Sequence, residues 1–284
     1  FPLAILGEGG LGKSVIAGQV LRHHDQQAPG HTLFCPCSQI PASADTSTLE
    51  ALDDLSHQCR LVVTCRGREW DDLLDPGDDS PFAEFRLPRL SRDQVLAWSC
   101  RFIDAHPELA RGAAFLASLE NALVRKNCLD LFGSPVRLAM ACEIYAVTGS
   151  LPEDLTVTSL YSAYWESKVA RDRRARRGAE AQEREQAAIC VAEGIWTTST
   201  TRFTEFVGLS PSHGSSALLS EGILQQVGLK VGFFHQTFAE YAVARHLATF
   251  AVARDWDRLG AALRRGAASE WGVATHLVAL DLDE

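Results

Sequence analysis

The sequence predicts a chain in three parts: an α/β domain built on a parallel sheet, an all-helical region, and a shorter segment in which helices flank a β-hairpin. Before residue 89, short apolar runs alternate with amphipathic stretches, which is the pattern of a parallel sheet with helical crossovers. After residue 89, apolar residues recur at helical spacing, and two adjacent strand-like runs appear only between residues 224 and 235. A chain of 284 residues also has room for about two domains.

The α/β part is predicted to alternate four strands with two helices. The strands are the apolar runs Leu3–Leu6, His31–Cys37, Leu61–Cys65 and Phe85–Pro88. The helices are Ser14–His24, which has helical composition, and Thr48–Gln58, in which leucines recur every third residue after a run of capping residues. Strands that alternate with helices favour parallel pairing.

The all-helical region is predicted to hold five helices separated by turns rich in Gly, Ser or Pro. They are Ser91–Ala105, Leu109–Leu131, Pro135–Val147, Ser159–Arg177 and Gln182–Trp196. The stretch Arg171–Glu185 mixes charges of both signs, so a solvated helix end or connector is favoured over a basic patch for nucleic acid.

The last segment has the outline of a winged helix. Short helices are expected near Phe203–Val207 and Ser216–Glu221, then a strand pair, Leu224–Gly228 and Gly232–His235, and then the helix Ala239–Phe250. We therefore divide the chain into an α/β domain (1–88), a small helical domain (89–150), a winged-helix domain with a helical lead-in (151–250) and the start of a further helical region (251–284).

Composition excludes several classes of protein. Apolar residues make up 46% of the chain and charged residues 22%, which excludes a disordered or low-complexity protein. The 27 basic and 36 acidic side chains give a net charge of −9, which argues against a nucleic-acid footprint spread over a whole domain. No apolar run reaches the ~20 residues that span a bilayer, and the eight scattered cysteines favour reduced thiols over zinc or disulfides. A cytoplasmic protein is therefore expected. Because the chain starts inside a strand and without Met, we expect it to be a piece of a longer polypeptide.

A glycine-rich motif lies between the first strand and the first helix. Residues 7–14 fit the phosphate-loop pattern G-x-x-x-x-G-K-[ST] in the strand–loop–helix context that the pattern requires. Its glycines allow backbone N–H groups to approach phosphate oxygens, and the helix N-terminus adds partial positive charge. Lys13 would bring an ammonium group to the β- and γ-phosphates, and the Ser14 hydroxyl would coordinate Mg²⁺. The candidate ATP- or ADP-binding residues of this segment are Gly7, Glu8, Gly9, Gly10, Leu11, Gly12, Lys13, Ser14 and Val15.

Arg66 is the second candidate catalytic residue, and an expected acid is absent. Arg66 follows the strand Leu61–Cys65 at the carboxyl edge of the sheet, where it is either a γ-phosphate contact or a solvated strand-end arginine. P-loop ATPases also use a carboxylate on another strand to hold Mg²⁺ through water, and no strand-like run of this domain is followed by Asp or Glu. Lys13 and Leu61 lie 48 positions apart, which leaves room for one crossover unit of ~30 residues. Either a strand and its acid have been lost or the sequence omits residues; we favour omission, and expect the complete polypeptide to carry an acid-terminated strand between His24 and Leu61.

Beyond the phosphate loop, three stretches resemble the signal-transduction NTPases with numerous domains (STAND), specifically their NACHT branch. The strand Leu61–Arg66 resembles the sensor-1 strand of that family. Leu87–Ser91 followed by a helix, and Gly133–Pro135 opening another helix, resemble its small helical domain with a glycine-x-proline motif. Phe233–Tyr241, which reads FFHQTFAEY, resembles its winged-helix signature. These stretches run in the family's order over nearly the whole chain, and the absent carboxylate departs from the family's pattern.

The resemblance implies an α/β P-loop NTPase domain, then a helical domain and a winged-helix domain, acting together as a nucleotide-controlled switch. Pro135 would pack near the adenine, and His235 would contact the β-phosphate of bound ADP. The module would be closed with ADP and would self-oligomerise with ATP and Mg²⁺, hydrolysing ATP slowly. Such a module belongs to a cytosolic signalling or antiviral-defence protein, and its trigger, a protein or a nucleic acid, is sensed outside this segment.

The residues alone leave other interpretations open. Ser134 and Pro135 are also an ordinary N-cap and first-turn pair, and His235 could be a core histidine. A transcription regulator could use the winged helix on DNA, although the helix Ala239–Phe250 offers only Arg245 and His246 against Glu240. A continuously cycling ATPase would need a second acid and a substrate site, and the helical tail supplies neither.

Overall fold

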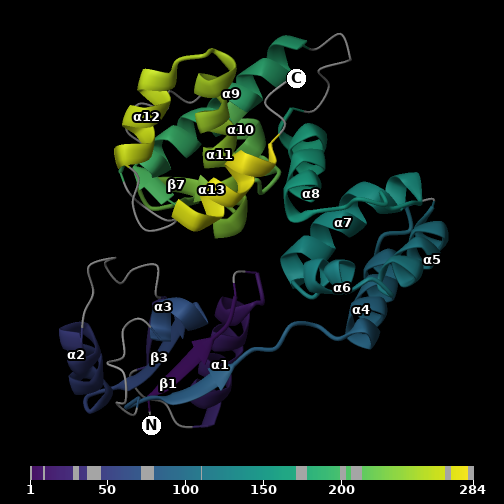
Figure 1. Ribbon diagram of the computed structural model, residues 1–284. Coiled ribbons are helices and arrows are strands. Elements are labelled where there is room, and N and C mark those ends of the chain that lie inside the picture. The colour runs from purple at the N-terminus through teal and green to yellow at the C-terminus, as the bar shows by residue number, and fades with distance from the viewer. Residues whose placement is uncertain are drawn as a thin grey trace. The chain divides into compact units, whose positions relative to one another are not determined.

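A computed structural model describes residues 2–8, 10–27, 32–36, 46–71, 80–109, 111–170, 178–198, 203–205, 213–265 and 270–280 (Figure 1). They belong to two compact units. One unit comprises Phe1–Trp98 with Leu129–Ala139, and the other comprises Ser99–Cys128 with Met140–Glu284. The three-domain division predicted above stays a prediction.

The first unit contains a four-stranded sheet in which all strands are parallel. The strands are β1 (Leu3–Leu6), β2 (Thr32–Pro36), β3 (Arg60–Cys65) and β4 (Ala83–Arg86), in the order β2-β3-β1-β4. Strand β1 therefore has a partner on both sides, with Leu6 opposite Cys65 on β3 and opposite Arg86 on β4. The predicted parallel α/β arrangement is confirmed.

Both faces of this sheet are covered by apolar side chains, as a parallel sheet requires. On one face, Ile5 and Val62 pack with Ala17 of helix α1 (Lys13–Gln27). On the other face, Leu6 and Val63 pack with Leu52 of α2 (Thr46–Ser56) and Trp70 of α3 (Gly67–Asp71). Because successive residues of a strand point to opposite faces, one four-residue strand serves both layers.

Four helices follow β4, and two of them replace a single helix that the sequence predicts. They are α4 (Arg92–Ala105), α5 (Gly112–Ala122), α6 (Lys126–Phe132) and α7 (Pro135–Thr148). The predicted single helix over Leu109–Leu131 is wrong because the backbone tightens between α5 and α6. There the Arg125 N–H bonds to the Ala122 carbonyl, three residues earlier, and the Arg125 guanidinium donates to the Glu153 carbonyl at 2.5 Å. These contacts turn the chain where local apolar spacing alone would have continued the helix.

The predicted helix Ser159–Arg177 is also shorter and different in kind. Helix α8 (Val157–Tyr164) begins at a capping box between Thr156 and Ser159 and continues as the π-helical turn η2 (Trp165–Val169). There the Ala170 N–H bonds to the Trp165 carbonyl, five residues earlier. Residues 171–177 lie outside the described residues, and α9 (Gly178–Thr197) follows.

The chain then forms a three-stranded antiparallel sheet framed by helices. The order is β5-β7-β6, with β5 (Phe203–Glu205), β6 (Leu224–Val227) and β7 (Lys230–Phe233). The short helix predicted near Phe203–Val207 is wrong, because Phe203–Glu205 pairs with β7 as a strand, with Phe203 opposite Gly232. Tertiary pairing therefore decides the conformation of a segment too short to specify its own.

The remaining helices enclose an aromatic core. They are α10 (His213–Ser220), α11 (Gln236–Val252), α12 (Trp256–Arg265) and α13 (Glu270–Ala279), and α11 packs against α9 and α13. The fully buried Phe238 lies at the centre of this core. Six aromatic rings have centroids 5.3–6.2 Å from its own: Tyr161, Tyr164, Trp165, Phe233, Phe234 and Tyr241.

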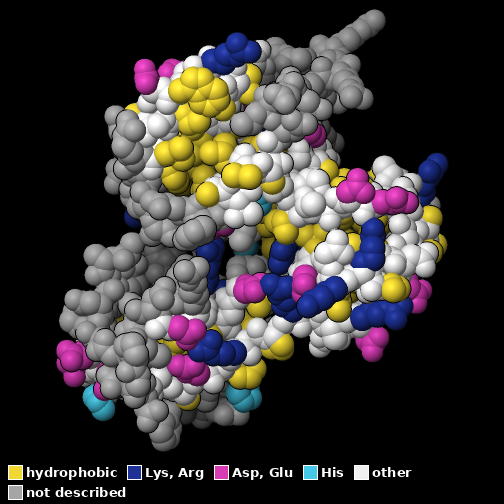
Figure 2. Space-filling view, in the orientation of Figure 1, with side chains coloured by type: hydrophobic (Ala, Val, Ile, Leu, Met, Phe, Trp, Pro, Cys, Tyr) yellow, Lys and Arg dark blue, Asp and Glu magenta, His cyan; other side chains and the backbone are white. Residues whose placement is uncertain are grey.

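The surface carries both signs of charge. On the face shown in Figure 2, basic and acidic side chains are interspersed, and hydrophobic side chains gather near α12, where Trp256 is 62% exposed. Among the described helices, none is both long and apolar enough to cross a membrane.

Candidate functional site

The loop between β1 and α1 lies at the carboxyl edge of the parallel sheet. Its backbone continues the sheet by one residue, because the Gly7 N–H bonds to the Cys65 carbonyl at 3.3 Å. Gly10 and Gly12 have φ of +86° and +85°, a conformation that residues with a Cβ rarely adopt. The Gly12 carbonyl accepts from the N–H groups of Val15 and Ile16 at 3.0 Å and so begins helix α1. Gly9 lies outside the described residues.

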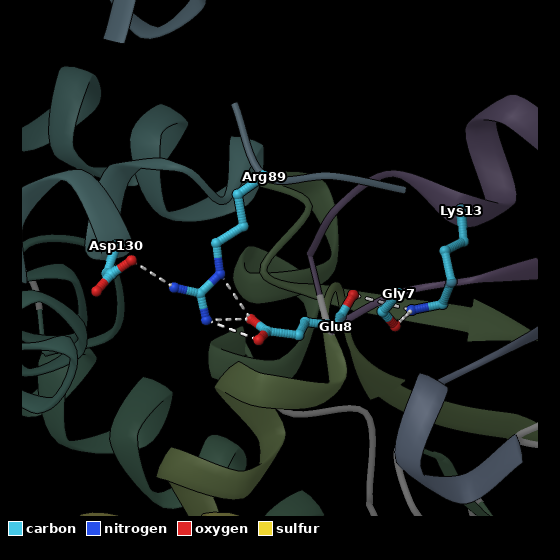
Figure 3. A network of polar contacts seen from close by, with 5 residues as sticks. All are labelled: Gly7, Glu8, Lys13, Arg89 and Asp130. Carbon is cyan, nitrogen blue, oxygen red and sulfur yellow. Dashed lines mark hydrogen bonds and ion pairs between the residues drawn. The ribbon is translucent and has the colours of Figure 1, made fainter. Parts of the chain in front are cut away.

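The Lys13 ammonium lies over this loop. Its Nζ donates to the carbonyl of Gly7 at 2.7 Å and to that of Glu8 at 2.9 Å (Figure 3). A lysine at the first position of a helix would ordinarily extend into solvent. Here it brings a positive charge to the N-terminus of α1, which itself favours anions.

The next two residues of α1, which are also candidate nucleotide contacts, are exposed. Ser14 and Val15 follow Lys13 in the first turn of α1, and the Val15 side chain is 63% exposed. An exposed hydroxyl at a helix N-terminus is a hard oxygen that can coordinate Mg²⁺. Leu11, in contrast, is largely buried: an added Cβ on Gly7 would lie 3.1 Å from Leu11 Cδ1 and 3.3 Å from Leu87 Cβ.

Arg66 lies beside the loop along the sheet edge. It directly follows β3, and the preceding residue, Cys65, is the one bonded to Gly7. The Arg66 side chain is half-buried, and its carbonyl accepts from the Trp70 N–H at 2.9 Å, which begins α3. The sequence prediction that Arg66 lies at this edge is therefore confirmed, while its contact with a γ-phosphate stays a prediction.

A charged network that sequence reasoning missed connects the loop to α6. Arg89 donates to both carboxylate oxygens of Glu8, with Nη2 at 2.7 and 2.6 Å from Oε1 and Oε2, and to Asp130 at 3.0 Å (Figure 3). The hydrogen bond to Glu8 is the main cause that raises the pKa of Arg89 above its ordinary value. No motif marks Asp130 in the sequence, and only its place on α6 brings it to Arg89.

The first turn of α7 packs directly on the loop within the same unit. A Cβ added to Gly10 would lie 2.5 Å from Ser134 Oγ and 2.5 Å from Val136 Cγ1. Pro135, predicted to lie near an adenine, is half-buried at the first position of this helix. The backbone before Pro135 is held by a hydrogen bond from the Leu90 N–H to the Gly133 carbonyl at 2.9 Å. The structure thus places Pro135 in the same unit as Lys13, next to Ser134, which touches the loop.

His235 belongs to the other unit, where it caps α11. Its Nδ1 accepts from the Thr237 N–H at 3.2 Å and lies 2.9 Å from Thr237 Oγ1. Tyr161 completes the chain, with its hydroxyl 2.6 Å from the same Thr237 Oγ1. Because Nδ1 is the acceptor, a neutral His235 carries its proton on Nε2.

The acidic side chains of the described residues are not grouped as metal ligands. None of the four strands of the parallel sheet ends at a carboxylate, and no group of three or more His, Cys, Asp or Glu side chains is placed to hold a metal ion among these residues. Residues 37–45 and 72–79 lie outside the described residues. The missing acid predicted for the natural chain stays a prediction.

Comparison with known proteins adds no relative: no family model and no curated protein sequence matches the chain.

Proposed function

We propose that the chain binds ATP and ADP at the loop Gly7–Ser14 and acts as a nucleotide-controlled switch. One observation carries the proposal: the Lys13 ammonium lies over a glycine-rich loop between an inner strand of a parallel sheet and a 15-residue helix. Loop N–H groups, a helix N-terminus and a lysine together favour a polyanion. A nucleoside di- or triphosphate is the polyanion that fits a loop of this sequence.

The residues around the loop fit a nucleotide and its metal ion. The positive φ angles of Gly10 and Gly12 give a backbone that can face phosphate oxygens. The exposed Ser14 hydroxyl is the proposed Mg²⁺ ligand. When bound, Mg²⁺ would neutralise phosphate charge. We assign Arg66 to the γ-phosphate because it follows the residue that bonds to Gly7, and Pro135 to the adenine because it begins the helix that packs on the loop.

The switch is proposed from the resemblance to NACHT proteins, and the second unit supports it. Helix α10, the hairpin β6–β7 and helix α11 follow one another as in a winged helix. At the start of α11, the Thr237 contact keeps the His235 proton on Nε2, so this atom is a donor. We propose that it binds the β-phosphate of ADP at rest, and that the ATP form self-oligomerises, with slow hydrolysis, in a cytosolic signalling or antiviral-defence protein. Its trigger would be sensed outside this segment.

The two alternatives lack support in the described residues. A DNA-reading helix would need basic side chains available to DNA. Arg245 instead pairs with Glu166 and Glu185 at 3.4 and 3.3 Å and lies over the Trp165 ring, and His246 is buried. A continuously cycling ATPase would need a second acid together with a substrate site, and we assign neither among the described residues of the helical segments.

The switch is tested by the mass of the full-length protein in ADP and in ATP with Mg²⁺. We expect monomers with ADP, larger assemblies with ATP, and assembly of His235→Ala even with ADP. Losing a hydrogen bond to a charged group shifts a closed–open equilibrium by roughly tenfold to a hundredfold. His235→Asp is the matched variant, because its carboxylate keeps the cap on Thr237 but repels a phosphate. Both variants remaining monomeric with ADP, at unchanged ADP affinity, would refute this role of His235.

A further inference from the structure

Ser134 combines two properties that rarely occur together. The residue is 0% exposed, and its hydroxyl has no hydrogen-bond partner among the described residues. Buried polar atoms are nearly always paired, and leaving one unpaired destabilises a fold. A serine directly before a helix usually caps it. Ser134 precedes α7 and still makes no capping bond with its side chain.

The hydroxyl is directed at the candidate phosphate loop. Ser134 Oγ occupies the space that a side chain on Gly10 would fill, 2.5 Å from the position of its Cβ. The N-terminus of α7, a 14-residue helix, lies at the same place. Its first-turn N–H groups have no partner within the helix and favour an anion there. Pro135 provides no N–H in that turn, so the Ser134 hydroxyl is a donor that can replace it.

We infer that the Ser134 hydroxyl donates a hydrogen bond to a phosphate oxygen of the nucleotide bound at the loop. This inference rests on the proposed nucleotide binding. The partner is a phosphate oxygen because Ser134 Oγ lies against Gly10 of the loop and because the α7 N-terminus favours negative charge. Since Gly10 now covers Ser134, the ligand reaches the hydroxyl only when the loop shifts away from α7. Nucleotide binding is therefore coupled, through Ser134, to the contact between the loop and α7.

The inference predicts opposite effects of Ser134→Ala on two measurements. Without nucleotide, the melting temperature rises by a few degrees, because an unpaired buried hydroxyl is removed and no capping bond is lost. With nucleotide, calorimetry shows affinity for ADP, and for inorganic pyrophosphate, weakened roughly tenfold or more. Ser134→Cys has the same shape with a somewhat larger atom in place of the oxygen, and its thiol is a weak donor, so it also loses affinity.

Two controls separate the possible outcomes. Ser99 is also fully buried, but its Oγ accepts from Cys142 Sγ at 3.9 Å, so Ser99→Ala leaves ADP affinity unchanged. If Ser134→Ala and Ser134→Cys bind ADP within twofold of the wild type, the inference is overturned while nucleotide binding stands. If only ADP, and not pyrophosphate, binds more weakly, the contact to a phosphate oxygen is wrong. If the wild type binds neither ligand, the proposed function fails and this inference fails with it.

Discussion

Arg89 donates to both carboxylate oxygens of Glu8, at 2.6 and 2.7 Å, although the two residues lie 81 positions apart. Glu8 is part of the candidate phosphate loop, and Arg89 lies on the segment that leads from β4 to α4. A bidentate arginine of this kind neutralises an acid that would otherwise repel an anion at the loop.

We predict that Arg89→Ala weakens ADP affinity a few-fold, and more at low salt, because it exposes the loop to the Glu8 charge. The free energy of unfolding should change by less than about 1 kcal/mol, since the side chains of Glu8, Arg89 and Asp130 are all substantially exposed. Calorimetry at two ionic strengths measures the affinity. The double variant Glu8→Gln/Arg89→Ala should recover it, whereas Arg86→Ala, which breaks pairs with Asp71 and Glu84, should leave it unchanged. Wild-type affinity of Arg89→Ala at both ionic strengths would contradict the prediction.

Gly10→Ala should destabilise the protein more than Gly12→Ala. Both positions have positive φ, which costs an alanine about 1–2 kcal/mol. At Gly10 the new Cβ also meets Ser134 Oγ and Val136 Cγ1 at 2.5 Å, whereas at Gly12 nothing lies within 4 Å. The additional overpacking costs about 1–3 kcal/mol and is measured by urea denaturation. Equal losses at the two glycines would show that α7 does not pack on the loop.

The ring of His235 should be protonated on Nε2 when neutral. Nitrogen NMR of the imidazole distinguishes the two tautomers. Both Thr237→Ser, which keeps the hydroxyl 2.9 Å from Nδ1, and Thr237→Val, which removes it, should preserve this state, because the backbone N–H of residue 237 still donates to Nδ1. A wild-type ring protonated on Nδ1 would contradict both the cap and the donor role proposed for Nε2.

Stability should fall as the pH drops below about 6.5, in part through His246. Burial against α11 neighbours, including the Phe250 ring 5.0 Å away, lowers the pKa of His246 from its ordinary 6.5. The nearby Arg258 lowers it further, and Glu193 opposes both. Because the unfolded chain then binds this proton more tightly than the folded protein, acid favours unfolding. The difference in melting temperature between pH 7.5 and 5.5 should be smaller in His246→Gln; an unchanged difference would show that His246 does not contribute.

Local patterns predicted most elements of the fold and failed where tertiary contacts decide. The runs at Leu3–Leu6 and Leu61–Cys65 are strands because they are apolar on both faces, and a buried parallel strand needs nothing else. In contrast, Phe203–Glu205 is a strand only because β7 pairs with it. At the turn between α5 and α6, Arg125 contacts the carbonyl of Glu153, 28 positions later, and no local pattern reveals such a contact.

The candidate site also contains residues that the sequence predicts and residues that only the structure reveals. The glycines, Lys13 and Ser14 could be predicted because phosphate chemistry requires those residue types at fixed spacing. Arg89 and Asp130 could not, because an arginine–carboxylate network has no sequence spacing. Ser134 was visible only as part of a glycine-x-proline motif. Its contact with Gly10 depends on how α7 packs against the loop.

The most direct test of nucleotide binding is a calorimetric titration of ADP with Mg²⁺ into the wild type and into Lys13→Ala. We expect the wild type to bind one equivalent. We expect Lys13→Ala to lose measurable binding, because it removes the ammonium that lies over the loop at the Gly7 and Glu8 carbonyls. We expect it to keep its melting temperature, because Lys13 lies outside the apolar core of the sheet. Equal affinity of the two proteins for ADP, or no binding by the wild type, would contradict the proposal that this loop holds a nucleotide.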